Sequence, residues 1–389
     1  MEEWKRYKMG DFIDFNPTIS LKKGTVARKI TMDKLIPHSR DIYDWEYEPY
    51  SGGSKFQNGD TIMARITPCL ENGKHAFISL LDEGETAYGS TEYIVMRGIP
   101  GISDNRFVYY LSHFPDFKNA AVKSMVGSSG RQRAQIDVLK NIEFFLPGLE
   151  EQRQIADTLS ALDDKIALNN RINHNLEEQA KALYKSWFVD FEPFKDCGFV
   201  DSELGNIPKG WGVRNLLEVA TLYDSKRKPL SGKDREKMEK RYPYYGATSV
   251  MDYVDDYIFD GIYLLMGEDG SVMTDDGFPI LQYVSGKFWP NNHAHVLQGC
   301  NGFTTEMLHC ALLRKVIKSS VTGAVQAKIS QANMKKILFP YPPKDVLKDF
   351  DSIIQDIYRE KRSIESQNVT LSALRDNMLP QLLSGKVII

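Results

Sequence analysis

The sequence lacks the motifs of the common self-contained enzymes. Each of its four Gly-Lys pairs lacks a glycine five positions before its own glycine, so there is no GxxxxGK[ST] phosphate-binding loop. No GxGxxG follows a strand-like run, and no GxSxG nucleophile elbow occurs. The segment Asn16-Pro17-Thr18 lacks the second proline and the aromatic residue of an adenine-methylating NPPY loop. We therefore expect a chain without a catalytic centre of its own.

Cysteine pairs and long apolar runs are also missing. Cys69, Cys197, Cys300 and Cys310 are scattered and form no CxxC pair, which is typical of a reducing compartment. No stretch approaches the roughly 18 apolar residues of a membrane span. The opening residues MEEWKRYKMGDF lack the basic and apolar regions of a secretory signal. We expect a cytoplasmic protein that does not contact a membrane.

One group of metal-binding residue types does gather in the second half of the chain. It consists of His293, His295, Cys300, His309 and Cys310. Their spacing matches no standard zinc pattern. We therefore expect no metal site here, and favour a buried or base-facing histidine pair.

The net charge of −3 argues against a uniformly basic nucleic-acid-binding protein. Local basic stretches remain, because residues 226–241 hold eight basic and three acidic side chains. Arg131 and Arg133 stand in a second stretch, GSSGRQR. Such stretches fit a groove lined locally by Lys and Arg, or alternatively solvated loops.

A long helix-period run is the main feature that is present. From Leu149 to Phe188, mostly apolar positions recur in steps of four and three, the spacing of a coiled-coil seam. Adding 195 to each position gives a second seam in the same phase. The predicted seam residues are Ile155, Leu159, Leu162, Ile166, Asn169, Asn173, Leu176, Leu183 and Trp187, then Phe350, Ile354, Ile357, Ile364, Asn368, Leu371, Met378 and Leu382.

The regions before the two helices repeat each other as well. Trp4 corresponds to Trp211, Gly59 to Asp260, Gly98 to Gly299 and Pro147 to Pro342, so the offset falls from 207 to 201 to 195. Internal duplication of this length dictates the architecture. We predict an α+β fold with mixed α/β domains at 1–147 and 208–342, helical spacers at 148–190 and 343–389, and a linker at 191–207.

A helix of about 40 residues with an apolar stripe is not stable alone, and its own copy is the simplest partner. Antiparallel pairing would place the two domains at opposite ends of the helices, related by a pseudo-twofold axis. Asn169, Asn173 and Asn368 would then favour one register, because a polar seam residue penalises slipped pairings. The alternative is that the asparagines mark a wetter, looser segment.

Three segments resemble the specificity subunit of type I restriction–modification systems. Leu204-Gly-Asn-Ile-Pro-Lys-Gly-Trp211 resembles the family's entry to the second recognition domain. Pro147-Gly-Leu-Glu-Glu-Gln-Arg-Gln-Ile155 resembles the opening of its first helical region. Leu374-Arg-Asp-Asn-Met-Leu-Pro-Gln-Leu-Leu-Ser-Gly385 resembles its C-terminal segment. The second helix departs from the pattern, because Lys344-Asp-Val-Leu-Lys348 has no Glu-Gln pair.

The resemblance implies a non-catalytic subunit that directs a complex to a bipartite target in double-stranded DNA. Each recognition domain would read one half, and the antiparallel coiled coil would set the spacing and dock the partners. Those partners would be two modification subunits, which methylate adenine N6 with S-adenosylmethionine after flipping the base, and restriction subunits, which use ATP and Mg²⁺. No cofactor is expected in this chain.

Candidate DNA-binding residues are polar loop residues at corresponding places in the two domains. Arg would read guanine, Asn adenine, and Lys would hold phosphates. The candidates are Arg65, Thr67, Lys74, Ser90, Thr91, Ser128, Arg131 and Arg133 in the first domain, and Lys226, Arg227, Lys228, Glu268, Asn291, Asn292, His293 and Lys328 in the second.

Two other functions are compatible with parts of this pattern. The alternative is the recognition subunit of a fused restriction–methylation enzyme that cuts on both sides of its site, which has the same recognition logic and a different partner. A self-contained enzyme or a coiled-coil adaptor that does not bind DNA belongs to a different class, and a DNA titration of the assembled complex separates it from the other two.

Overall fold

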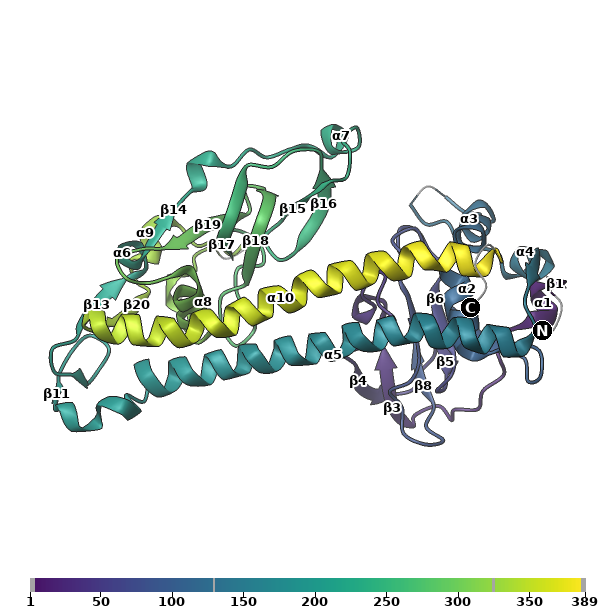
Figure 1. Ribbon diagram of the computed structural model, residues 1–389, viewed down its shortest axis with the longest axis horizontal. Coiled ribbons are helices and arrows are strands. Elements are labelled where there is room, and N and C mark those ends of the chain that lie inside the picture. Colours follow the sequence, from purple (N-terminus) through teal and green to yellow (C-terminus); the bar gives the residue numbers. More distant parts are fainter. Residues whose placement is uncertain (1–3, 129, 324–325, 386–389) are drawn as a thin grey trace. The chain divides into compact units, whose positions relative to one another are not determined.

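The computed structural model describes residues 4–128, 130–323 and 326–385, so Ser129 of the GSSGRQ segment and both extreme ends lie outside the described residues (Figure 1). The chain divides into unit 1, Met1–Asn170 with Gln367–Ile389, and unit 2, Arg171–Ser366. Two long helices, α5 (Leu149–Phe188) and α10 (Lys344–Leu383), each contribute one half to each unit. The compact units are therefore divided within the helices and not at the ends of the globular domains.

Unit 1 contains a two-stranded ribbon, β1-β10, and two four-stranded sheets with the orders β2-β9-β6-β7 and β4-β3-β8-β5. Its strands are β1 (Lys5–Lys8), β2 (Ile13–Phe15), β3 (Val26–Ile30), β4 (Glu46–Pro49), β5 (Ser54–Phe56), β6 (Thr61–Ala64), β7 (His75–Phe77), β8 (Ala87–Gly89), β9 (Tyr93–Gly98) and β10 (Glu143–Leu146). Its short helices are α1 (Met9–Phe12), η1 (Met32–Lys34), α2 (Asn105–His113), α3 (Pro115–Lys123) and α4 (Ile136–Asn141).

Unit 2 contains the ribbons β11-β12 and β13-β20 and a six-stranded sheet of order β14-β19-β17-β18-β15-β16. Its strands are β11 (Phe199–Val200), β12 (Ile207–Pro208), β13 (Gly212–Asn215), β14 (Ala220–Leu222), β15 (Tyr242–Tyr245), β16 (Val250–Val254), β17 (Phe259–Gly267), β18 (Leu281–Pro290), β19 (Ala294–Gly299) and β20 (Leu338–Tyr341). Its short helices are η2 (Glu192–Cys197), α6 (Leu216–Val219), η3 (Asp224–Lys226), α7 (Gly232–Arg235), α8 (Thr305–Leu313), η4 (Lys318–Ser320) and α9 (Gln331–Met334).

The predicted duplication is confirmed by strand register. The order β2-β9-β6-β7 corresponds to β14-β19-β17-β18, and β1-β10 corresponds to β13-β20. Ile13 pairs with Gly98 as Ala220 pairs with Gly299, which matches the predicted offsets of 207 and 201. One alignment was wrong by two residues. Since Ala64 pairs with Tyr93 and Gly267 with Ala294, β6 corresponds to β17 at an offset of 203, not 201. A shift of two leaves every side chain on the same face, so alternation alone does not reveal it.

Gly98 and Gly299 correspond because the chain turns sharply into the next helix at both places. A Cβ atom at Gly98 would lie 2.6 Å from the Ser103 carbonyl oxygen, and one at Gly299 would lie 2.4 Å from that of Phe303. The helices that follow, α2 and α8, begin with side-chain caps. Asp104 accepts from the N–H of Arg106 and Phe107, and Thr304 accepts from that of Met307. Such caps satisfy free N–H groups of the first turn.

Both units complete their hydrophobic cores with side chains from both long helices. In unit 1 these are Ile155, Ala156 and Leu159 of α5 and Leu379, Leu382 and Leu383 of α10. In unit 2 they are Ala180, Tyr184 and Phe188 of α5 and Leu347, Phe350, Ile354 and Tyr358 of α10. The helix segments are therefore part of the domain cores.

The two helices run antiparallel within each unit, as predicted. In unit 1, Asp163 binds Arg375 at 2.6 Å, and the Asn169 amide donates to Asn368 at 2.7 Å. The residue number therefore rises along α5 while that of the contacted residue in α10 falls. In unit 2, Glu177 binds Lys361 at 3.1 Å, and the Phe188 and Phe350 rings lie 4.7 Å apart.

The predicted seam is only part of the buried surface of the helices. The buried seam residues are Ile155, Leu159, Asn169, Phe350, Ile354, Ile364 and Leu382. The half-buried seam residues are Leu162, Ile166, Asn173, Leu176, Leu183, Trp187, Ile357, Asn368, Leu371 and Met378. Four residues beside the seam are also buried, because they face the globular domains: Gln152, Asp163, Tyr184 and Leu379. A seam periodicity identifies the contact between the helices but not this second contact.

The Glu-Gln pair at the start of α5 attaches that helix to its domain. Glu151 accepts a hydrogen bond from the Trp4 indole at 3.1 Å. Gln152 is buried, accepts from the Asp104 N–H and donates to the carbonyls of Ile102 and Pro147. In α10 the offset of 195 places Val346 and Leu347 here, so an apolar contact replaces the polar one.

The predicted linker at 191–207 is more ordered than expected. It forms η2, β11 and β12, and its Phe191 and Phe194 rings lie 5.4 Å and 4.9 Å from the Trp211 ring. Edge-to-face aromatic packing of this kind stabilises a short segment that lacks helical or strand periodicity.

Phe350 provides a test of the role of α10 in unit 2. Its ring is fully buried against Tyr184, Trp187 and Phe188. We expect Phe350→Ala to lower the free energy of unfolding by about 3–5 kcal/mol, because it leaves a cavity. Ile353→Ala, at an exposed position of the same helix, is the matched control and should cost well under ~1 kcal/mol. Equal effects in urea unfolding would contradict this assignment.

We expect both units to lose stability in acid, because each contains a buried histidine. Burial lowers the pKa of His75 and of His309 to about 3. Unfolded histidine titrates near pH 6.5, so below that pH the unfolded chain binds protons that the folded chain does not. Stability is therefore fully present above pH 6.5. Each histidine should remove roughly 1 kcal/mol between pH 7.5 and 5.5.

Urea unfolding at the two pH values measures this loss. The double variant His75→Gln with His309→Gln should show a smaller loss, because neither side chain then titrates. An unchanged loss would assign the acid sensitivity to other groups.

Candidate nucleic-acid interface

In unit 1, three chain segments meet at the end of the central sheet. The Arg65 N–H donates to the Glu92 carbonyl at 2.9 Å, and the Ala134 N–H donates to the Arg65 carbonyl at 2.8 Å. The Thr67 N–H donates to Gln132, and Val126 and Arg133 exchange a pair of hydrogen bonds at 3.1 and 3.0 Å. We call this set of backbone contacts the junction of unit 1. It brings Val126 and Arg133 side by side.

Unit 2 has the same junction in the same register. The Glu268 N–H donates to the His293 carbonyl at 2.8 Å, and Ile329 donates to Glu268 at 2.9 Å. Gly270 donates to Ala327, and Thr322 and Lys328 exchange bonds at 2.9 and 2.7 Å. Glu268 thus stands where Arg65 stands, His293 where Glu92 stands, and Lys328 where Arg133 stands. The backbone is repeated, but Arg65 is replaced by the acidic Glu268 and Glu92 by His293, whereas Arg133 and Lys328 are both basic.

Arg133 and Glu92 form the strongest side-chain contact at the junction of unit 1. The Arg133 Nε lies 2.9 Å from both Glu92 carboxylate oxygens, and its Nη2 lies 2.6 Å from Oε1. The hydrogen bond from Arg133 holds the pKa of Glu92 below its ordinary value, and the Arg65 charge contributes. Arg65 itself is half-buried and donates to the Ala134 carbonyl at 3.1 Å.

The other predicted residues of unit 1 differ in availability. Thr91, Ser128 and Arg131 are exposed. Ser90 accepts from the Glu92 N–H, and Thr67 donates to Glu71. The Lys74 ammonium donates to the Met32 carbonyl at 2.8 Å, so it serves the fold.

The junction of unit 2 carries a network of charged groups. The buried His295 imidazole binds Asp224 at 2.6 Å and the Ile329 carbonyl at 2.9 Å. Burial alone would raise the pKa of Asp224, but its hydrogen bonds with His295 and the Val296 N–H hold that pKa below its ordinary value. Arg227 binds Glu268 at 2.7 Å, Asp224 at 3.5 Å and the Ala294 carbonyl at 2.7 Å.

Three predicted residues of unit 2 are therefore committed to the fold. Arg227 is nearly enclosed by its partners, and Glu268 binds both Arg227 and, at 3.4 Å, Lys328. Asn291 is buried and accepts from the His293 N–H. Lys226, Lys228, Asn292, His293 and Lys328 remain exposed, and His293 binds Asp269.

Asp224, Glu268 and His295 are the one group in the described residues whose ligand atoms are close enough for a metal ion, within 4.8 Å of one another. The Arg227 guanidinium already supplies a positive charge there, and both His295 nitrogens have protein partners. The other metal-binding types lie elsewhere. His309 and Cys310 contact the Tyr358 hydroxyl at 2.7 and 3.4 Å, and Cys300 contacts the Glu218 carbonyl.

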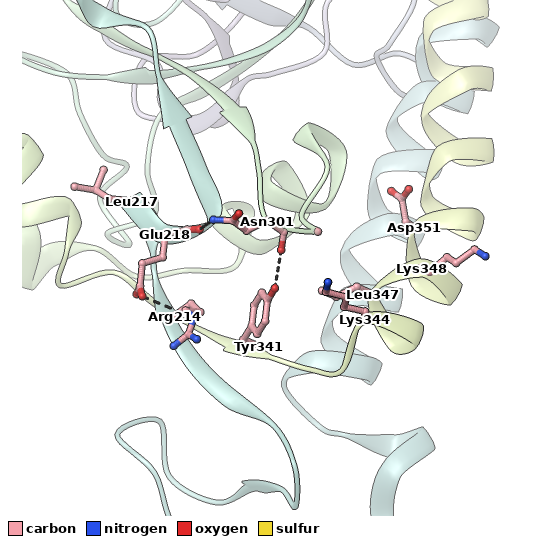
Figure 2. Close-up of a pocket in the computed structure, with 10 residues that line it drawn as sticks. Arg214, Leu217, Glu218, Asn301, Tyr341, Lys344, Leu347, Lys348 and Asp351 are labelled. Carbon is pink, nitrogen blue, oxygen red and sulfur yellow. Dashed lines mark hydrogen bonds and ion pairs between the residues drawn. The ribbon is translucent and has the colours of Figure 1, made fainter.

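A cavity of about 900 Å³ lies in unit 2 at the opposite end of β19 from the junction. Figure 2 shows Tyr341 donating to the Asn301 carbonyl, and Lys344, Leu347, Lys348 and Asp351 projecting from α10. Arg214 lies near Glu218, at 3.7 Å, and over the Tyr341 ring. Charges of both signs line this cavity, and it contains none of the predicted DNA-binding residues.

Sequence reasoning predicted Glu268 but missed three other carboxylates that hold predicted residues. Glu92, Asp224 and Asp269 contact Arg133, Arg227 and His293, respectively. The repeat supplied a usable signal, because Glu92 and His293 occupy equivalent positions before β9 and β19. Glu92 was not among the predicted residues, although the equivalent His293 was.

Comparison with known proteins places the chain in a family. The model of the type I restriction modification DNA specificity domain matches residues 1–178 and again residues 208–369. The chain belongs to this family. The MjaIX type I restriction enzyme specificity subunit of Methanocaldococcus jannaschii is 27% identical over 377 residues, which cover 90% of this chain and 85% of that protein.

Two further proteins show the same relationship. The HindI specificity subunit of Haemophilus influenzae is 21% identical over 481 aligned residues that cover both chains fully. The fold is similar to the crystal structure of a type I restriction–modification S subunit from M. genitalium, with a TM-score of 0.50, 15% identity and coverage of 98% and 96% of the two chains. None of the helices in the described part of the chain has the length and apolar character needed to cross a membrane.

The burial of Arg227 leads to a stability prediction. Arg227→Ala would remove the guanidinium that Glu268 and Asp224 share in a partly buried site, although His295 and Lys328 would still contact them, and should lower the free energy of unfolding by about 2 kcal/mol. Lys228→Ala removes an exposed neighbour of the same charge and should change it by less than ~0.5 kcal/mol. Thermal unfolding of the two variants checks this, and equal stability would show that Arg227 is not structural.

Proposed function

We propose that this chain is the DNA-specificity subunit of a type I restriction–modification complex and reads a bipartite target in double-stranded DNA. The observation that carries the proposal is the repeated junction. Two domains of one family hold the same backbone but present different charged side chains. Two such readers suit a target whose halves differ in sequence.

The helices would set the distance between the half-sites. Each domain core includes segments of α5 and α10, so each domain is fixed to the helices that it packs against. Antiparallel pairing of two continuous 40-residue helices gives a spacer whose length depends on residue number, at about 1.5 Å per residue.

Catalysis would belong to partner subunits. We propose that two modification subunits dock on this chain and methylate adenine N6 with S-adenosylmethionine, and that restriction subunits add ATP- and Mg²⁺-dependent cleavage. This assignment is supported by the missing catalytic motifs in the sequence and by the family.

The first experiment is to purify the chain with its modification partner, methylate genomic DNA and map the modified adenines by single-molecule sequencing. We expect one split sequence with a fixed gap. Methylation without sequence preference would refute the proposal.

The spacing role predicts the effect of a paired insertion. One heptad inserted beside Asn173 and another beside Asn368 should lengthen the gap by about 10 Å, or roughly three base pairs, and leave both half-sites unchanged. The single insertions are controls, because each breaks the pairing register and should weaken assembly. New half-site sequences with an unchanged gap would contradict the spacer role.

A further inference from the structure

The geometry of Arg133 bears on which base one half-site contains. Glu92 engages the side edge of the guanidinium, formed by Nε and Nη2. The end-on edge, formed by Nη1 and the second hydrogen of Nη2, faces away from Glu92. Within the described part of the chain, this edge makes one long hydrogen bond, 3.5 Å from Nη1 to the Arg131 carbonyl. The Arg133 side chain remains 43% exposed.

We propose that Arg133 reads a guanine through its end-on edge, and that Glu92 is the positioning residue that fixes the plane of its guanidinium. This inference rests on the proposed function. Guanine presents O6 and N7 in the major groove, and the two end-on N–H groups of arginine match them. A guanidinium fixed beforehand on its other edge loses less side-chain entropy on binding than a free one.

The repeated junction supports this choice of residues over their neighbours. Arg133 is held in place by two backbone bonds to Val126, beside the loop that carries exposed Ser128 and Arg131. The equivalent positions in unit 2 carry Lys328 and His293, which are also exposed and also bound to carboxylates. A repeated backbone with exchanged side chains is what two readers of different sequences require.

Contact with a backbone phosphate is the alternative use of the same arginine. A phosphate contact would strengthen binding to every sequence and would steepen the salt dependence, whereas a guanine contact acts at one base pair. The two uses therefore differ in what a substitution changes.

The test uses the complex with the modification subunit and DNA substrates that carry each single base-pair change in the split target. Arg133→Lys keeps the charge but loses the planar fork, and should reduce discrimination at one G·C pair of one half-site by roughly ten- to a hundredfold. Glu92→Gln should weaken discrimination at the same pair by a smaller factor, while KM for the other substrates is unchanged. Glu143→Gln, a matched carboxylate change 4.0 Å from Arg6 on the exposed ribbon β1-β10, should leave that pair unaffected.

A change in the DNA provides a second test with the unaltered protein. Replacing the guanine of that pair by 7-deazaguanine removes the N7 acceptor and should reproduce most of the Arg133→Lys loss. The inference is overturned if Arg133→Lys and Glu92→Gln slow methylation of all substrates by one common factor, or if 7-deazaguanine has no effect at any guanine of either half-site. A wild-type complex without a split target would instead refute the proposed function.

Discussion

The structure depends on burying the apolar faces of α5 and α10 in two places at once. Neither helix could persist as an isolated rod, since an amphipathic helix gains its stability mainly from packing. In each unit the helices pack on each other and also enter the domain core, through Leu159 and Leu382 in unit 1 and Phe188 and Phe350 in unit 2. A recognition domain therefore has no complete core without segments from both helices. Folding of the domain and pairing of the helices are one process.

This shared core explains why the two copies keep the same layout while their contacts diverge. At the start of α5 the domain is held by the amide of Gln152, and at the start of α10 by the methyl groups of Leu347. Tyr110 donates to Asp163 of α5, whereas His309 meets Tyr358, the residue of α10 that corresponds to Asp163. Each solution satisfies or removes the buried polar groups, as burial requires. The geometry of the contact is preserved, and its chemistry is not.

The sequence was sufficient for the duplication, the helix bounds and the antiparallel pairing, because these depend on periodicities that extend over many residues. It did not predict features that depend on a single contact between residues. The two-residue offset between β6 and β17 leaves the alternation of faces unchanged, and only pairing with β9 and β19 reveals it. Basic residues were found by type, but of their carboxylate partners Glu92 and Asp224 were not. Arg227 and Arg133 look alike in sequence, yet one is enclosed by Asp224 and Glu268 and the other is half exposed.

Arg227 and Arg133 differ in how many of their donors are bound by protein acceptors. Arg227 donates to the carbonyls of Asp224 and Ala294 and to the Glu268 carboxylate, and removing it would take a cationic partner from two partly buried carboxylates. An arginine held on one edge keeps its other edge for a ligand and is ordered before the ligand arrives. The junction of unit 2 contains the first kind, Arg227, and the junction of unit 1 contains the second, Arg133. In the proposed function, the number of occupied donors, and not the charge of the side chain, therefore distinguishes Arg227, which holds its junction together, from Arg133, which keeps donors for DNA.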